Sequence, residues 1–262
     1  MPELPEVETI KNQLLSFLPD QKLLKIEIKD PRIFSNPIFV TSLQKQKLKN
    51  LKRKGKWLFF LFDKNVLGLH LGLTGKLLVK SLPSPHLISV FLFENVYLYF
   101  YDIRKFGKIM IWDYTSWKKF LTSMGKDAME ITFLELKKLL SNSSQKIKAF
   151  LLDQKKISGI GNIYADEILF TAEINPHRLA FSLKSQEIKK LFKSMKIKLK
   201  EGINLKGCSI RDYRDIFNKK GRFQTRLNVY GRGGKPCLRC GNLLKEDKIL
   251  QRTTTYCEFC QK

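Results

Sequence analysis

The pattern of apolar and polar positions divides the chain into an extended half and a helical half. Near the start, apolar residues recur at helical spacing, at Leu4, Val7, Ile10, Leu14 and Leu18. We therefore expect a helix over residues 3–18, which the proline at position 19 ends. From residue 22 to residue 112 the apolar residues alternate with polar ones or form short buried runs, which is typical of strands. Residues 88–93 and 96–101 flank a compact turn and predict a hairpin.

Helical spacing returns in the second half of the chain. Residues 113–130 show no clear period and are predicted to form a linker. Thr132 and Glu135 form a capping box in front of a leucine-rich segment, so a helix should begin there. Three more helices are expected, over residues 144–154, 163–173 and 185–201. The pattern predicts an α+β protein, in which an antiparallel β-sandwich with one attached helix precedes a helical part.

The charge of the chain points to a polyanionic partner. Its 262 residues include 49 lysines and arginines against 24 acidic residues, which gives a formal net charge of +25. Nucleic acid is the first candidate partner, and an anionic membrane surface is the second. No apolar run approaches the roughly 20 residues of a membrane-spanning helix, and the acidic, proline-bearing start does not resemble a secretory signal. We therefore expect a cytoplasmic protein that binds nucleic acid.

Four of the five cysteines form two pairs with the spacing of a metal site. The pair Cys237 and Cys240 is separated by 16 residues from the pair Cys257 and Cys260. This is the arrangement of a zinc ribbon with four thiolate ligands. Because a four-thiolate zinc has no open coordination position, we expect one structural Zn²⁺ that folds the ribbon and does no chemistry. Cys208 has no evident partner and is expected to be an ordinary buried thiol.

The opening sequence Met-Pro-Glu-Leu-Pro-Glu allows two interpretations. If Met1 is removed, the secondary amine of Pro2 becomes the amino terminus, and an α-amino group is far less basic than a lysine side chain. Such an amine can attack a sugar carbon or an aldehyde to form an iminium, with Glu3 and Glu6 as general acid and base. The same residues are also ordinary at the start of a helix. The residues alone favour neither interpretation.

Two polar residues in the extended half have neighbours that suggest contact with phosphates. His70 lies between Gly68 and Gly72, on the strand face opposite a row of leucines. Glycines on either side leave room for the backbone of a ligand, although a single histidine is more often structural. Lys56 lies in a basic turn just before a buried strand, which can hold its amine at the surface of the domain. A solvated basic turn is the alternative.

Three further segments suggest contacts with nucleic acid. Arg104 and Phe106 follow a hairpin strand, and side chains of this kind can wedge into a duplex and fill the space of an extruded base. A buried Phe106 is equally compatible with the pattern. The glycine-broken turn before residue 163 places backbone amides at a helix start, which is an anion site, although a plain turn explains the glycines as well. Arg252, between the cysteine pairs, is suited to contacting backbone phosphates, and a solvated arginine is the alternative.

Six motifs follow one another along the chain. They are Pro-Glu-Leu-Pro-Glu-Val-Glu-Thr, Arg-Lys-Gly-Lys-Trp, His-Leu-Gly-Leu-Thr-Gly, Asp-Ile-Arg-Lys-Phe-Gly, Gly-Ile-Gly-Asn-Ile-Tyr-Ala-Asp-Glu and the terminal zinc ribbon. In this order they resemble the formamidopyrimidine-DNA glycosylases of bacterial base-excision repair. The resemblance implies a bifunctional glycosylase and AP lyase that excises oxidised purines, chiefly 8-oxoguanine and formamidopyrimidines, and then cleaves the abasic strand by β,δ-elimination.

The resemblance also implies an organisation into domains. It implies an N-terminal β-sandwich catalytic domain over residues 1–125, a helix-two-turns-helix DNA-binding domain over 126–225 and a zinc ribbon over 226–262. Double-stranded DNA with a damaged base is expected to lie in the cleft between the domains. We expect the protein to act as a monomer in the bacterial cytoplasm, at the nucleoid.

Roles for single residues follow from the same resemblance. Pro2 is expected to attack C1′ of the damaged nucleotide and Glu3 to protonate the deoxyribose ring oxygen, with Glu6 in support. Lys56 counts with these catalytic residues because it is expected to touch the phosphates at the lesion. The remaining DNA contacts are expected from His70, Arg104, Asn162, Tyr230 and Arg252.

The base-replacing wedge implied by the resemblance consists of Leu73, Arg104 and Phe106. Leu73 departs from the methionine that is usual in the family. Leucine fills a similar volume with less flexibility, so we expect base flipping to survive with altered efficiency. Residues 211–224 align with a lesion-capping loop.

Two other functions remain open. An endonuclease VIII-type enzyme would act on oxidised pyrimidines, but that branch usually opens with Pro-Glu-Gly-Pro-Glu, where this chain has Leu4. A non-catalytic zinc-ribbon protein would bind DNA without cutting it, and the intact Pro2 and Glu3 speak against it. Catalysis by Pro2 requires that Met1 is removed. Without that step the chain is expected to bind damaged DNA and leave it uncut.

Overall fold

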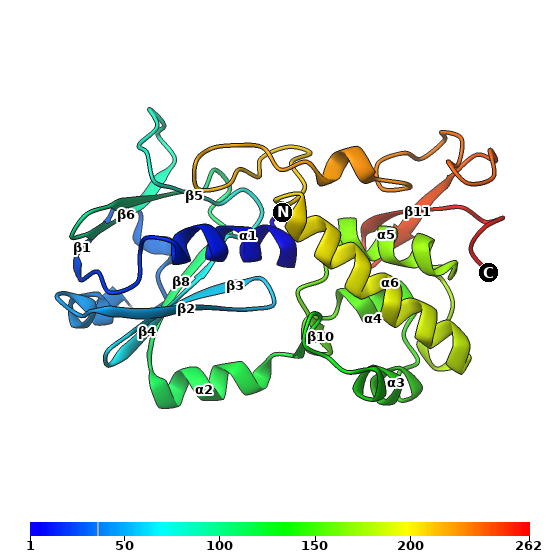
Figure 1. Ribbon diagram of the computed structural model, residues 1–262, viewed down its shortest axis with the longest axis horizontal. Coiled ribbons are helices and arrows are strands. Elements are labelled where there is room, and N and C mark those ends of the chain that lie inside the picture. Colours follow the sequence, from blue (N-terminus) through cyan, green and yellow to red (C-terminus); the bar gives the residue numbers. More distant parts are fainter. Residues whose placement is uncertain (36) are drawn as a thin grey trace. The chain divides into compact units, whose positions relative to one another are not determined.

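The computed structural model describes residues 1–35 and 37–262, which form two compact units. The first unit comprises Met1–Ser123 and Gly202–Gln224, and the second comprises Met124–Glu201 and Thr225–Lys262. The chain therefore leaves the first unit, builds most of the second, and returns to the first for a short segment (Figure 1). The predicted division into three domains, at residues 125 and 225, stays a prediction.

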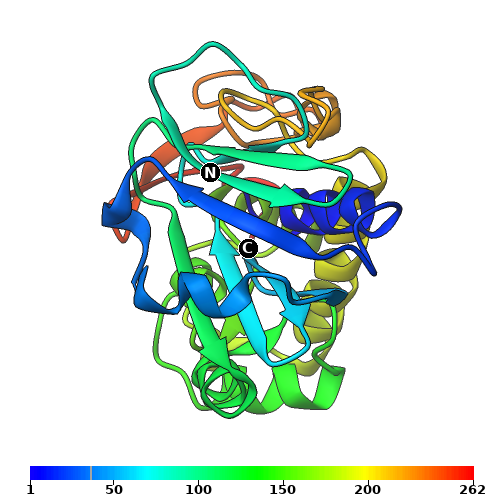
Figure 2. The same ribbon diagram turned by 90° about the vertical axis from the view of Figure 1, so that its left-hand side faces the viewer.

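The first unit contains two four-stranded antiparallel sheets (Figure 2). The strands of one sheet, in spatial order, are β1 (Leu23–Ile28), β6 (Leu87–Phe93), β7 (Tyr97–Tyr101) and β5 (Lys76–Leu78). Those of the other are β2 (Leu48–Lys54), β3 (Trp57–Phe62), β4 (Asn65–His70) and β8 (Lys108–Asp113). Apolar side chains of both sheets share one core, in which the rings of Phe60 and Phe91 stack 6.5 Å apart. The predicted β-sandwich is confirmed, and so is the hairpin of β6 and β7.

Two helices accompany the sandwich. The apolar face of α1 (Leu4–Leu15) is buried in the shared core. Helix α2 (Tyr114–Ser123) covers the outer face of the β2–β3–β4–β8 sheet, where Trp117 packs against Phe59 (Figure 1). The prediction of a linker over residues 113–130 was wrong for residues 114–123, which form this helix, although the boundary between the units lies within the predicted range. The helix spans fewer than three turns, too few for a clear period, and aromatic rings on the sheet supply the surface that stabilises it.

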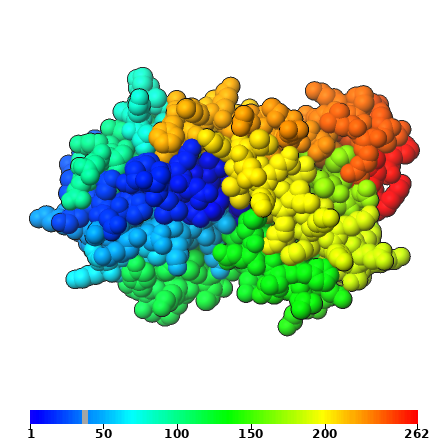
Figure 3. All heavy atoms as spheres, in the orientation of Figure 1, coloured from blue at the N-terminus to red at the C-terminus, as the bar shows by residue number. Residues whose placement is uncertain are grey.

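The returning segment, residues 202–224, is packed onto the first unit. Tyr213 and Ile216 are buried in its core, and Gln13 Nε2 donates to Asp215 Oδ2 over 2.8 Å. Figure 3 shows this segment, yellow to orange, against the dark blue amino-terminal helix. Short 3₁₀ turns complete the described parts of the unit, at η1 (Pro31–Ile33) and η2 (Pro37–Leu43), and η4 (Phe223–Arg226) begins where the returning segment ends.

The second unit is mostly helical. Its helices are α3 (Phe133–Ser141), α4 (Ile147–Leu152), α5 (Asn162–Ala172) and α6 (Ser185–Asn204), with a 3₁₀ turn at η3 (Ala180–Ser182). The short strands β9 (Lys126–Asp127) and β10 (Ile157–Ser158) pair in parallel, and β11 (Lys245–Ile249) and β12 (Arg252–Tyr256) form an antiparallel hairpin. All four predicted helices are present with slightly shifted ends, and the predicted capping box of Thr132 and Glu135 begins α3. The α+β class is confirmed.

Among the described residues, none of the helices combines the length and the apolar character that crossing a bilayer requires.

Candidate functional site

The residues before α1 are held in place by one buried carboxylate, that of Glu6. Its Oε2 accepts the backbone N–H of Glu3 over 2.7 Å, and its Oε1 accepts the backbone N–H of Cys208 over 2.7 Å. Pro2, Glu3 and Glu6 are all buried, whereas Met1 is 41% exposed. Glu6 therefore ties the helix start to the returning segment, and the direction of Pro2 is set by the first turn of α1.

Gly207 explains how the returning segment approaches this carboxylate so closely. Its φ is +84°, and a Cβ atom at this position would lie 2.8 Å from Cγ of Glu6. Only glycine adopts this backbone conformation readily and also leaves room for the Glu6 side chain. Cys208, the next residue, is buried as predicted.

Lys56 and His70 lie close together at one end of the β2–β3–β4–β8 sheet. Lys56 is buried in the turn between β2 and β3, and His70 ends β4 opposite Trp57. Burial, together with the positive charges of Lys56 and Lys108, lowers the pKa of His70 to about 4. Because Gly72 donates its N–H to Nδ1 of His70 over 3.1 Å, the proton of the neutral ring is on Nε2. The ring can thus donate one hydrogen bond to an anion without carrying charge.

The glycines around His70 have a different role from the one predicted. A Cβ atom on Gly68 would lie 2.5 Å from the ring of Trp112, and one on Gly72 would lie 2.5 Å from the backbone at Phe106. Gly72 also has a φ of +62°. The expectation that both glycines leave an open face for a ligand was wrong. They make room for an aromatic side chain and for a neighbouring loop of the protein itself.

The three predicted wedge residues come from two adjoining turns. Leu73 follows Gly72, whose backbone packs on Phe106 and Gly107. Phe106 is 52% exposed, which excludes the buried alternative, and Arg104 Cζ lies 4.9 Å from the centre of its ring. The structure therefore brings an exposed apolar ring, a guanidinium and a half-buried leucine together.

Buried Asp102 organises the base of these turns. Its Oδ2 accepts the backbone N–H of Gly107 over 2.7 Å, and its Oδ1 accepts the hydroxyl of Thr74 over 2.5 Å. Thr74 Oγ1 in turn accepts the backbone N–H of Arg104 over 3.1 Å. Asp102 begins the motif Asp-Ile-Arg-Lys-Phe-Gly, so an acidic residue at the start of a functional loop was the signal that could have identified it.

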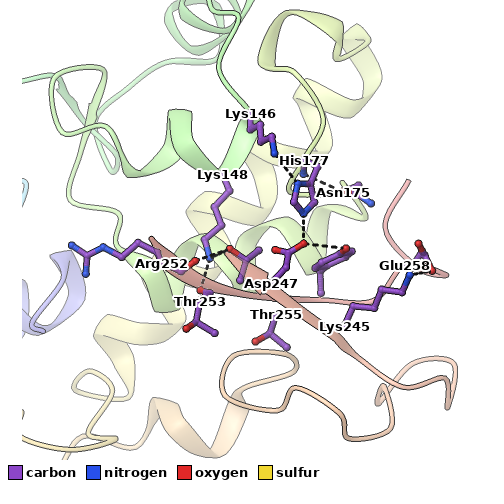
Figure 4. Close-up of polar contacts among 12 residues, drawn as sticks. Lys146, Lys148, Asn175, His177, Lys245, Asp247, Arg252, Thr253, Thr255 and Glu258 are labelled. Atoms are coloured by element: carbon purple, nitrogen blue, oxygen red, sulfur yellow. Dashed lines mark hydrogen bonds and ion pairs between the residues drawn. The ribbon is translucent and has the colours of Figure 1, made fainter. Parts of the chain in front are cut away.

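In the second unit, Asn162 and Arg252 are brought together by one backbone carbonyl. Asn162 is the first residue of α5, and its Nδ2 donates to the Thr253 carbonyl over 2.9 Å. Arg252 precedes Thr253 at the start of β12 and points away from the polar cluster beneath it (Figure 4). Two side chains predicted to contact phosphates thus share one anchored segment of backbone.

A buried ion pair, which the sequence did not reveal, supports this segment. Lys148 Nζ lies 2.7 Å from Asp166 Oδ1 and donates to the Thr254 hydroxyl over 2.9 Å. It also donates to the Thr253 carbonyl over 2.9 Å (Figure 4). The side chains of Lys148 and Asp166 are 0% and 1% exposed. Burial raises the pKa of Asp166 to about 7, against the lowering effect of Lys148. Asp166 belongs to the Tyr-Ala-Asp-Glu end of a recognised motif, which was its only sequence signal.

The neighbouring acid, Glu167, holds the turn that carries Tyr230. Its carboxylate accepts the backbone N–H groups of Asn228, Val229 and Tyr230 at distances of 2.9–3.0 Å. The amide side chain of Asn228 also donates to it over 2.9 Å. Glu167 therefore determines where Tyr230 lies, although the sequence indicated only the tyrosine.

The four paired cysteines converge on one point of the second unit. Their sulfur atoms all lie within 4.8 Å of one another. Polar hydrogens of the knuckles already face the sulfurs, since the Arg239 N–H donates to Cys237 Sγ and Asn242 Nδ2 donates to Cys240 Sγ, each over 3.4 Å. Four converging thiols with supporting donors fit a tetrahedral zinc that has no open position. The predicted cofactor, one structural Zn²⁺, is confirmed.

Residues 211–224, the predicted lesion-capping loop, are held by a second carboxylate. Asp215 Oδ1 accepts the backbone N–H groups of Phe217 and Lys219 over 3.0 and 2.8 Å. Phe217, at the tip, is half exposed. The role of this segment at a lesion stays a prediction.

Family models of known proteins match most of the chain. Residues 1–109 match the N-terminal domain of formamidopyrimidine-DNA glycosylase, residues 124–214 match its H2TH domain, and residues 234–262 match a zinc finger found in FPG and IleRS. The formamidopyrimidine-DNA glycosylase of Carboxydothermus hydrogenoformans is 41% identical over 271 residues, covering 100% of both chains.

Solved structures are similar over the whole chain. A Lactococcus lactis Fpg in complex with DNA that contains an abasic site superposes with a TM-score of 0.92 at 31% identity, over 99% of both chains. The wild-type Lactococcus lactis Fpg (MutM) in complex with DNA that contains N7-benzyl-Fapy-dG gives a TM-score of 0.91 at 31% identity, over 100% of both chains.

Proposed function

This chain belongs to the formamidopyrimidine-DNA glycosylase family, and we propose that it is a bifunctional enzyme that excises oxidised purines from duplex DNA and then cleaves the abasic strand. The substrates proposed are 8-oxoguanine and formamidopyrimidines. The name shared by its relatives and the Fapy-dG and abasic DNA bound by its structural neighbours support this choice. We propose that the enzyme acts as a monomer in the bacterial cytoplasm.

The observation that carries the proposal is the position of Pro2 directly before the Glu6-anchored start of α1. Glu6 already accepts two backbone N–H groups, so its role is to hold the chain at Pro2 and Glu3 rather than to move protons. Met1 is exposed and precedes a small residue, which suits its removal. The mature chain would then begin with a secondary amine that is rigidly attached to a helix.

The amine and the carboxyl group of Glu3 can carry the first half of the reaction. Pro2 nitrogen forms a bond to C1′ of the damaged nucleotide as the bond from C1′ to the base breaks, and the proton that the nitrogen loses goes to the departing base. Glu3 protonates the ring oxygen as the sugar opens, which leaves an iminium between Pro2 and C1′. The iminium then acidifies the C2′ proton. Loss of that proton expels the 3′ phosphate, and a second elimination expels the 5′ phosphate.

Lys56 and His70 are proposed to hold the phosphates at the lesion. Lys56 supplies a positive charge, and the neutral ring of His70 supplies one directed donor from Nε2. Asn162, Tyr230 and Arg252 would contact phosphates from the second unit. The Asn162 side chain donates to the Thr253 carbonyl, Glu167 holds the backbone at Tyr230, and Lys148 holds the backbone next to Arg252. Zn²⁺ keeps the ribbon folded around Arg252 and takes no part in the chemistry.

The wedge residues are proposed to replace the extruded base. The ring of Phe106 is 52% exposed and can stack in the duplex, and Arg104 beside it can donate to the orphan cytosine. Leu73 fills the space that a methionine occupies in most of the family. We expect extrusion to proceed with this leucine.

The test uses processed, zinc-loaded protein and a duplex with 8-oxoguanine opposite cytosine. We expect strand cleavage without borohydride and a covalent protein–DNA adduct with it, because borohydride reduces the iminium. Glu3→Gln should bind the duplex but lose base excision. Glu94→Gln, which removes an exposed acid of the same unit, is the matched control and should act as the unchanged enzyme.

Three results would contradict the proposal. Absence of both cleavage and adduct would favour a DNA-binding protein without catalysis. Cleavage at thymine glycol but not at 8-oxoguanine would favour an endonuclease VIII-type enzyme. A DNA affinity that does not fall with rising salt would contradict the many phosphate contacts proposed.

A further inference from the structure

We propose that Asp30 is a positioning residue for the wedge loop, residues 103–107, and that it enables Arg104 and Phe106 to enter the duplex together. Asp30 lies outside all six recognised motifs and about 75 residues before the loop in the sequence. The inference rests on the proposed function, since it concerns how the base is replaced after extrusion. It adds a residue from a separate part of the sandwich to that step.

The middle of the wedge loop adopts a conformation that its sequence disfavours. Lys105 has a φ of +55°, in the left-handed region that non-glycine residues rarely occupy. This reversal puts the side chains of Arg104 and Phe106 on the same side, where the guanidinium lies 4.9 Å from the centre of the ring. Asp102 and Thr74 hold the backbone at Arg104 and Gly107. A contact made by the Lys105 side chain would offset part of the cost of this conformation.

Asp30 supplies that contact. Its Oδ2 lies 2.7 Å from Lys105 Nζ, and the Asp30 side chain is only 11% exposed. Arg32 fixes the carboxylate from the other side, with Nε donating to Oδ1 over 2.9 Å and Nη2 donating to Oδ2 over 2.6 Å. The backbone N–H of Arg32 also donates to Oδ1 over 3.1 Å. Arg32 therefore holds the carboxylate in one orientation independently of Lys105.

The backbone after Asp30 contacts the strand that follows the wedge loop. Ser35 donates its N–H to the Ile109 carbonyl over 3.0 Å, and Phe34 forms a β-bridge with Ile109. Two contacts, one through Lys105 and one through β8, thus join the segment of Asp30 to the loop. Arg32 and Lys105 also hold the pKa of Asp30 well below its usual range, so the ion pair persists at physiological pH.

If the Asp30 carboxylate acted only through its charge, removing it should help DNA binding rather than impair insertion of the wedge. An acidic group beside a loop that enters DNA repels phosphates, and it neutralises a lysine that could otherwise contact them. Asp30→Asn should then strengthen binding to any duplex. If Asp30 positions the loop, the same change should slow insertion of the wedge even while binding to undamaged DNA is kept or improved. The two roles therefore predict results of opposite sign.

The experiment compares the full, zinc-loaded wild type with Asp30→Asn on a duplex that carries 2-aminopurine next to 8-oxoguanine. The fluorescence of 2-aminopurine rises when the wedge unstacks it, and base excision is followed on the same duplex in single turnovers. We expect both rates to fall about fivefold, as for loss of a partly exposed ion pair. Borohydride trapping on a single-stranded abasic oligonucleotide should be unchanged, because no opposite base has to be replaced there.

Two variants serve as controls for charge and for backbone conformation. Glu27→Gln removes an acid of β1 that pairs with Lys25 and with Lys29 just after the strand, and it should match the wild type in every assay. Lys105→Gly, added to Asp30→Asn, should restore the unstacking rate because glycine accepts a positive φ without help.

Each other outcome overturns the inference. Wild-type unstacking and excision by Asp30→Asn would show that the carboxylate does not position the loop. An equal loss on single-stranded abasic DNA would show that the change damages the chemistry or the fold instead. Failure of Lys105→Gly to rescue would contradict the role assigned to the positive φ. If the wild type excises no 8-oxoguanine, the proposed function itself is overturned. If the wild type and Asp30→Asn excise it at the same rate, only the role of Asp30 is overturned.

Discussion

Replacing Lys148 with methionine should destabilise the second unit, because its buried amine is the centre of the contacts that hold β12. The amine lies 2.7 Å from Asp166 Oδ1 and donates to the Thr253 carbonyl and the Thr254 hydroxyl. Methionine keeps the volume of the side chain but leaves the Asp166 carboxylate buried without a counter-charge. The Thr255 N–H still donates to Asp166 Oδ2 over 3.3 Å.

The size of the effect follows from the complete burial of both side chains. Removing one partner of a buried ion pair typically costs about 3–5 kcal/mol. In a chain of this size each kcal/mol lowers the melting temperature by roughly 2–4 °C, so we expect a fall of roughly 10 °C. Lys190→Met is the matched control, because Lys190 pairs with Glu173 over 2.8 Å at the surface. An exposed pair contributes about 1 kcal/mol at most.

The pH dependence of Lys148→Met should have a definite sign. Burial already raises the pKa of Asp166 from 3.8 to about 7, and loss of the lysine charge should raise it further. A group whose pKa is higher in the folded state stabilises the fold while it is protonated and loses that contribution as the pH rises. Below about pH 6 the folded forms of both proteins keep Asp166 protonated, so the difference between their stabilities should be smallest and nearly constant there. The difference should grow through neutral pH.

The assay is differential scanning calorimetry of zinc-loaded wild type, Lys148→Met and Lys190→Met between about pH 5 and about pH 8. A melting temperature for Lys148→Met no lower than that of Lys190→Met would refute the reasoning, and so would a difference that grows as the pH falls. Adding Asp166→Asn to Lys148→Met removes the unpaired charge, so it should recover part of the loss. No recovery would show that the amine acts through the threonines alone.

Gly68→Ala should lower the free energy of unfolding by about 1–3 kcal/mol in urea titrations, because the new carbon would lie 2.5 Å from the ring of Trp112. An unchanged urea midpoint would contradict this packing. His70→Gln should weaken binding to an abasic duplex by the same factor at about pH 6 and about pH 8. Burial lowers the pKa of His70 to about 4, so the ring is neutral at both pH values. A larger factor at the lower pH would mean that a charged ring makes the contact. Cys257→Ser should reduce the zinc content measured by mass spectrometry and lower the melting temperature, because the metal folds the ribbon; zinc loss with unchanged stability would contradict a structural role.

Much of the fold could be predicted where a regular pattern coincides with burial. Helix α1, the strands of the sandwich and the four later helices follow from apolar spacing, because their buried faces repeat at regular intervals. Helix α2 was missed because Trp117 and its aromatic neighbours gain their stability from the sheet rather than from a repeating pattern. Gly68 was misinterpreted for a similar reason, since the ring that fills its space belongs to Trp112, which is distant in the sequence.

For the candidate site, the sequence identified the groups that would carry chemistry and left out those that hold them. Pro2, Glu3, Arg104, Phe106, Asn162 and the four cysteines stand in recognisable motifs. The anchoring acids Asp102, Asp166 and Glu167 lie inside or beside the same motifs, but nothing in their spacing showed what they bind. Asp30 lies in no motif at all.

The sequence by itself determined the α+β class, the family, the zinc ligands and the positive charge. Each of these depends only on which residue types occur and on how they are spaced along the sequence. Only the tertiary structure decided the direction of Pro2 through Glu6 and Cys208, the neutral state of His70, and the pairing of Asp30 with Lys105. These depend on which groups meet after the chain has folded, and on how much water is excluded where they meet, and no separation along the chain expresses either quantity.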